Sequence, residues 1–161
     1  MTDHHTQSSS EAALHSGCLN TMLRTAARRV TLFYDAEMLP AGLSSAQARL
    51  VAVVAELDDA QGQGPLLQAV AAKLGLEVSA LTHALRPLIR DGVLTVTQGQ
   101  KDGRTRHARL TADGAARLDK VFALYAEANR QIDAVLGADQ AAELRRLAGL
   151  VLAADLGSAG A

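Results

Sequence analysis

Basic side chains gather in one part of the sequence. Between Lys73 and Arg109 there are seven Lys or Arg residues and three acidic ones, a local charge of +4, whereas the whole chain carries −1 and the remainder therefore −5. A local excess of positive charge attracts polyanions, so this segment could contact a phosphate backbone. The charge alone fits an ordinary solvated surface equally well.

A second group of chemically capable residues recurs at helical spacing inside this basic segment. It comprises Ser79, Thr82, His83 and Arg86. On a helix these four lie opposite the apolar residues Val78, Leu81 and Leu85. Hydroxyl, imidazole and guanidinium groups can donate hydrogen bonds to base edges or to phosphates. The spacing therefore favours a polar helix face that contacts nucleic acid over a face that is merely solvated.

A third group lies on a predicted β-hairpin. The β-forming residues 93–97 and 105–110 flank a turn-like stretch, 99–104, which predicts two paired strands with a long tip. The cations of this hairpin are Lys101, Arg104 and Arg106. They could contact phosphates or the minor groove, and Asp102 could orient the Arg104 guanidinium.

The elements around these residues predict a helix-turn-helix. Two short helices that cross steeply need a small residue at the crossing, a glycine able to take positive φ in the turn, and an apolar residue that packs back. Ala71, Gly75 and Leu81 meet these needs within 66–90. A helix-turn-helix followed by a hairpin is a winged helix. Pro87 predicts a bend in the second helix, after the polar residues.

Further helices flank this unit. Apolar periodicity predicts helices from about His15 to Asp35, from Ser44 with a capping box to Gln47, from a Thr111 cap to about Val135, and from an Asp139 cap onward. The fold class is therefore mainly α with a small β-hairpin wing. We expect a disordered tail at 1–12, a helical dimerisation domain at 13–36 and 111–156, and a winged helix-turn-helix domain at 37–110.

Three stretches of the sequence resemble the MarR family of bacterial transcription regulators. They are GLSSAQ from Gly42, LLQAVAAKLGLEVSALTHALRPLIRDGVL from Leu66, and KDGRTRHARLTADG from Lys101. The most specific part is Asp102-Gly103-Arg104 followed by Leu110-Thr111 and Gly114. The resemblance covers roughly Leu19 to Leu150.

The resemblance implies an intertwined homodimer held together by the N- and C-terminal helices, with double-stranded DNA as partner. The family's recognition positions fall on Ser79, Thr82, His83 and Arg86, and its wing arginine falls on Arg104. Members often have Arg where this chain has His83, which leaves base preference at that position open. The apolar stripes of the N- and C-terminal helices also favour a dimer. The winged unit has too small a core to bury a long flanking helix, so a second chain would have to cover these stripes. Two recognition helices about 34–36 Å apart would read a pseudo-palindromic operator.

The resemblance also implies a small-molecule effector, often an aromatic acid or its thioester, which releases a repressor from DNA. The matching surfaces lie near Met22, Arg24, Leu50 and Val54, where Arg24 could meet a carboxylate. Cys18 leaves a redox-responsive regulator open as an alternative, although we expect a packed and inert thiol.

Other classes are disfavoured by what the sequence lacks. GxSxG, HExxH, Walker and GxGxxG motifs are absent, so we expect no enzyme and no cofactor. His15 and Cys18 are too few to make a metal site. No apolar run approaches the roughly 18–20 residues of a membrane span, so we expect no membrane partner and a cytoplasmic location. A winged helix that binds only protein remains an alternative.

Overall fold

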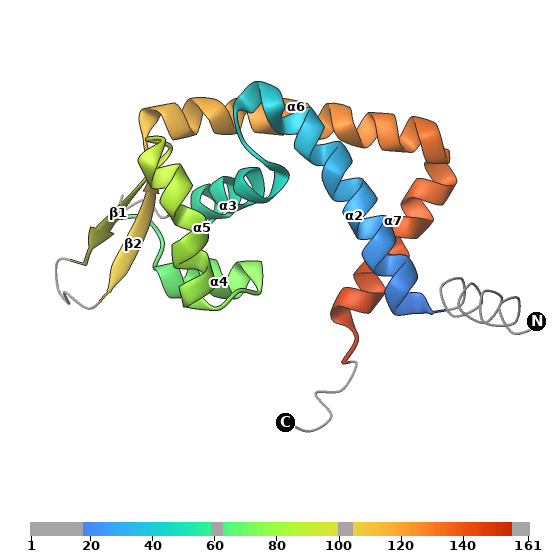
Figure 1. The fold of residues 1–161 in the computed structure, drawn as a ribbon, viewed down its shortest axis with the longest axis horizontal. Helices are drawn as coiled ribbons and strands as arrows, with labels where there is room; N and C mark the ends of the chain where they lie inside the picture. Colours follow the sequence, from blue (N-terminus) through green and yellow to red (C-terminus); the bar gives the residue numbers. More distant parts are fainter. Residues whose placement is uncertain (1–17, 59–62, 100–104, 156–161) are drawn as a thin grey trace, which may run out of the picture.

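The computed structural model describes residues 18–58, 63–99 and 105–155. Helices form most of these ranges, which also contain one antiparallel hairpin (Figure 1). The elements are α2 (Leu19–Met38), the 3-10 helix η1 (Leu39–Ala41), α3 (Ser45–Glu56), α4 (Leu67–Leu74), α5 (Val78–Arg90), β1 (Leu94–Gln98), β2 (Arg106–Leu110), α6 (Ala112–Leu136) and α7 (Ala138–Ala153). The predicted winged helix fold is confirmed.

The helix-turn-helix consists of α4, a glycine turn and α5. Gly75 has a φ of +67° and ends α4, and the Leu76 N–H then donates to the Ala71 carbonyl at 2.9 Å. An L side chain rarely adopts this backbone conformation, which explains the glycine. Ala71 and Leu81 are buried, as expected of residues at the helix crossing. Helix α5 continues through Pro87 to Arg90, so the proline does not end it early.

The hairpin is anchored to the chain that leads into α4. Strand β1 pairs with β2 from Leu94 opposite Leu110 to Gln98 opposite Arg106. On the other side of β2, the Ala108 N–H donates to the Pro65 carbonyl at 3.0 Å, and His107 Nδ1 lies 2.8 Å from the Gly64 carbonyl oxygen. These contacts fix the root of the wing against the start of α4.

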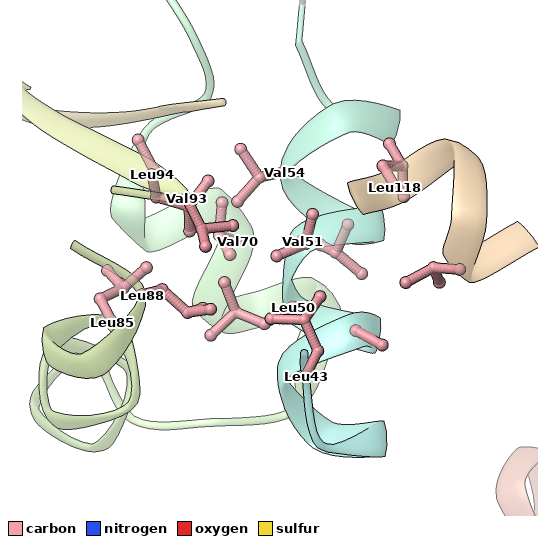
Figure 2. Packing of buried hydrophobic residues seen from close by; sticks show 14 of the residues in the cluster. Leu43, Leu50, Val51, Val54, Val70, Leu85, Leu88, Val93, Leu94 and Leu118 are labelled. Carbon is pink, nitrogen blue, oxygen red and sulfur yellow. The ribbon is translucent and has the colours of Figure 1, made fainter. Parts of the chain in front are cut away.

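One apolar core unites the winged unit with the first half of α6. Figure 2 shows Val51 and Val54 of α3, Leu85 and Leu88 of α5, and Leu118 of α6 converging on this core. Each of these side chains is buried. Because Leu118 belongs to the same cluster, the core of the winged unit extends past the boundary expected at residue 110.

The second half of α6 extends away from this core, beside α2 and α7 (Figure 1). Within the described ranges no single helix is long and apolar enough to cross a bilayer, although Leu19–Ala41 and Ser45–Glu56, bent by 67°, reach that length and composition together.

The predicted helix starts are confirmed for α3 and α6 but not for α7. Ser44 accepts from the Gln47 N–H at 3.2 Å, and Thr111 accepts from the Gly114 N–H at 3.0 Å. Asp139 was expected to cap the last helix, and this prediction is wrong. Gly137 takes the cap position with a φ of +86°, which lets the chain turn sharply between α6 and α7. Asp139 lies in the first turn of α7, where its negative charge is attracted to the positive end of the helix dipole.

Candidate nucleic-acid interface

The polar residues expected to contact nucleic acid share the outer face of α5. Ser79, His83 and Arg86 are exposed and Thr82 is half-buried. Behind them, Leu81, Leu85 and Leu88 are buried and fix α5 to the core. The Thr82 hydroxyl donates to the Val78 carbonyl at 2.8 Å. Its hydrogen is therefore engaged, and its oxygen remains able to accept a hydrogen bond.

Ion pairs divide the cations of the basic segment into two classes. Lys73 contacts Glu56 at 2.7 Å, and Arg90 contacts Asp91 at 2.8 Å. In contrast, Arg86, Arg106 and Arg109 form no ion pair with any residue that the structure describes. No acidic side chain among the described residues competes with a polyanion for these three guanidinium groups.

The wing brings further positive charge close to α5. Figure 1 shows the hairpin beside α5, and α5 packs against β1. Arg106 is exposed at the distal end of β2, opposite Gln98. The remaining predicted wing residues, Lys101, Asp102 and Arg104, lie outside the described residues.

A groove of about 550 Å³ opens between α2, α6 and α7. Its lining is mostly apolar and includes Val30, Phe33, Ile132 and Leu144. The helices around this groove expose many large apolar side chains. Leu152 is 88% exposed, Val135 83% and Leu19 64%. Large exposed apolar patches are typical of surfaces that bind a partner.

A second cavity, of about 420 Å³, lies between α3, the end of α4 and α5. It is lined by Leu50, Leu76 and Pro87, and Gln47 and Arg49 supply polar groups. Arg49 was missed at the sequence level. The sequence did hold one indication of Arg49, because it is the only charged residue of α3 before Glu56.

The residues expected to bind an effector do not together line either of the two cavities described above. Leu50 borders the 420 Å³ cavity, whereas Val54 is fully buried in the core. Met22 and Arg24 are exposed on α2 and border neither of the two cavities described above.

Cys18 immediately precedes α2, and its thiol is exposed in the single chain. Hydrogen bonds from the backbone and hydroxyl of Thr21, and from the backbone of Asn20, lower the pKa of the thiol. The described residues contain no group of three or more His, Cys, Asp or Glu side chains that could hold a metal ion.

Comparison with solved structures places this geometry among known folds. A Mycobacterium tuberculosis transcriptional regulator, MosR in complex with DNA, is 31% identical, with a TM-score of 0.70 over 86% of this chain and 96% of that chain. The repressor CouR of Rhodococcus jostii, bound to a 23-mer DNA duplex, is 22% identical, with a TM-score of 0.75 over 86% and 95% of the two chains.

A mutant of Escherichia coli MarR, complexed with operator DNA, is 19% identical, with a TM-score of 0.73 over 87% of this chain and 97% of that chain. No family model matches the sequence, and no curated protein matches it significantly. The match to MosR, together with the shared winged helix architecture, shows that the chain belongs to the MarR family of transcriptional regulators.

Proposed function

We propose that this protein is a dimeric transcriptional regulator that binds double-stranded DNA through α5 and the wing. The observation that carries the proposal is the arrangement of α5 beside the hairpin, with Arg86 and Arg106 exposed and without an ion pair among the described residues. Side chains of α5 reach base edges in the major groove, and cations of the wing contact phosphates or the minor groove. Lys101 and Arg104, with Asp102 beside them, belong to this proposed contact on the basis of the sequence.

We propose further that residues 13–36 and 111–156 form the dimerisation part and residues 37–110 the DNA-binding part. The groove between α2, α6 and α7 supports this division, because a second copy would cover its apolar lining. The exposed leucines of α7, such as Leu147 and Leu150, would be buried in the same contact. Two protomers would then present their α5 helices about 34–36 Å apart, to half-sites one helical turn apart.

The regulator is proposed to act as a repressor that a small aromatic or acidic effector releases from DNA. Two related structures support an effector: PcaV of Streptomyces coelicolor was solved with its natural ligand, and CouR with p-coumaroyl-CoA. In this chain the cavity between α3 and α5 is the better candidate site, because Arg49 can pair with a carboxylate beside an apolar lining. Met22, Arg24, Leu50 and Val54 remain the alternative set.

A selection experiment tests the proposed function. The wild-type protein is incubated with random duplexes at moderate salt, and the bound sequences are amplified and read. We expect enrichment of a pseudo-palindrome with half-sites one turn apart. Recovery of unrelated sequences, or of no DNA at all, would refute sequence-specific binding and leave the protein-interaction alternative.

The redox alternative depends on Cys18. Peroxide treatment of the wild type and of Cys18→Ser, followed by titration with the selected duplex, separates the two mechanisms. Loss of binding in the wild type alone would establish a redox input, and equal binding would exclude it. We infer that the protein binds DNA in the cytoplasm and does not act as an enzyme, because its solved relatives are transcriptional regulators.

A further inference from the structure

Ser45 forms hydrogen bonds to two of the helices that we assign to dimerisation, α2 and α6. Its backbone N–H and its hydroxyl both donate to Asp35 Oδ1 of α2, at 2.7 Å and 2.6 Å. Its carbonyl accepts from the Tyr125 hydroxyl of α6 at 3.2 Å. Ser45 is the first residue of α3. One residue of the winged unit is thus bonded to α2 and to α6 at once.

These bonds satisfy groups that α3 cannot satisfy by itself. The first N–H groups of a helix have no partner within the helix. The capping box satisfies the N–H groups of Ser44 and Gln47 but not that of Ser45. Among the described residues, the Ser45 N–H donates to Asp35. The Asp35 carboxylate also lies at the positive end of the α3 dipole, which adds to the attraction.

The position of Ser45 bears on where α5 lies, together with the apolar core that α3 and α5 share with α6. Helix α5 packs against α4 and β1, and α4 packs against α3. Figure 1 shows α3 between α2 and α5. A tilt of α3 about its first residue therefore carries α5 with it. Apolar contacts are not directional and tolerate small rotations, whereas hydrogen bonds depend on angle.

From this geometry we propose that Asp35, Ser45 and Tyr125 form a joint that sets the angle between the dimerisation helices and the DNA-binding unit. In a dimer this angle fixes the separation of the two α5 helices. The joint thereby selects the spacing of operator half-sites, and Asp35 and Tyr125 act as positioning residues that do not touch DNA. The inference rests on the proposed function, because it requires a DNA-bound dimer.

The chain supplies a matched control for Tyr125. The Tyr34 hydroxyl donates to Asn129 Oδ1 at 2.7 Å, and its ring lies 5.6 Å from that of Tyr125. This bond joins α2 to α6 without involving α3, and because Tyr34 also lines the groove assigned to dimerisation, sedimentation checks that the Tyr34→Phe variant is still a dimer. Tyr34→Phe and Tyr125→Phe thus each remove one hydroxyl from neighbouring rings, and only the second change loosens the joint.

The test measures affinity for the selected operator and for versions with one base pair added or removed between the half-sites. One base pair moves the half-sites by about 3.4 Å and about a tenth of a turn. We expect the wild type to prefer one spacing. In Tyr125→Phe this preference falls about fivefold, the effect of losing one typical hydrogen bond, and in Asp35→Ala, which loses two, it falls further. Tyr34→Phe keeps the wild-type preference, and Asp35→Asn, which retains an acceptor oxygen but not the charge, loses less of it than Asp35→Ala.

The outcomes distinguish the joint from the proposed function. If the wild type binds its operator and both joint variants keep its spacing preference, the joint is refuted and the proposed function stands. Equal loss of preference in Tyr34→Phe would also refute it, because the effect would then follow general destabilisation. If the wild type binds no duplex, the proposed function itself fails. Tyr125→Phe decides the question should Asp35→Ala not fold.

Discussion

Gly114, in the first turn of α6, lies directly against the backbone of Val93 at the start of the wing. A Cβ placed on Gly114 would be 2.1 Å from the Val93 carbonyl oxygen. The neighbouring Thr111 hydroxyl donates to the Gly92 carbonyl at 2.5 Å, and the Thr111 N–H donates to the Val93 carbonyl at 3.1 Å. The root of the wing and the start of α6 are therefore in backbone contact.

Gly114→Ala is expected to lower the free energy of unfolding by about 2–3 kcal/mol, because backbone atoms must separate to admit the methyl group. Urea unfolding measures the effect. The control is Ala116→Gly, an exposed position two residues further along α6, where only helix propensity is lost, at a cost of about 1 kcal/mol. A smaller loss for Gly114→Ala than for this control would show that the close contact does not exist.

Arg86→Ala and Arg106→Ala are each expected to weaken DNA binding. If each guanidinium contacts a phosphate, the slope of log K against log salt becomes shallower by about 0.9 per removed contact. Titrations of a selected duplex at several salt concentrations measure this slope. Lys120→Ala removes an exposed cation from α6 and serves as the control. An unchanged slope in both arginine variants would exclude this face as the phosphate contact.

Arg104→Ala tests the wing tip separately. We expect lower affinity with an unchanged dimer, because the side chain would contact DNA and not the second protomer. Titration together with analytical ultracentrifugation gives both readings. If Arg104→Ala binds DNA with wild-type affinity, the wing tip does not contribute to binding.

Leu147→Glu is expected to dissociate the dimer, since it places a charge on the apolar face of α7. Leu147 is 46% exposed in the single chain. Burying an unpaired charge is far costlier than leaving it in water. Sedimentation measures the oligomeric state, and Leu39→Glu is the control, because Leu39 is 72% exposed on η1, outside these helices. A dimer that persists in Leu147→Glu would contradict the assigned interface.

Acid is expected to weaken the contact between Asp35 and Ser45. The two hydrogen bonds from Ser45 hold the pKa of Asp35 below its usual value. The stabilisation is therefore complete above the ordinary carboxyl pKa and is lost as the pH falls through the lowered value. The difference in unfolding free energy between the wild type and Asp35→Ala should be largest at neutral pH and shrink on acidification. A difference independent of pH would contradict this.

The sequence predicted those parts of the fold that depend on local signals. Gly75 predicted the turn, and the Ser44–Gln47 spacing predicted the start of α3. The alternation of polar and apolar residues around Leu81 predicted which face of α5 is exposed. The error at Asp139 has a local cause too, because Gly137 with its positive φ displaced the expected cap.

Contacts between distant residues could not be predicted in this way. Asp35 and Ser45 meet across the η1 turn, and Tyr125 reaches the same residue from 80 positions further along the chain. Arg49 borders a cavity only because three helices meet there. Periodicity and motifs do not predict contacts of this kind, because the contacts follow from tertiary packing.

The central claim is that two protomers place their α5 helices in successive major grooves of one duplex. Hydroxyl-radical footprinting of the selected operator, with the stoichiometry measured in the same sample, tests it most directly. We predict two protected segments about one helical turn apart, with two protomers bound per duplex. A single protected segment, or one protomer per duplex, would contradict the claim.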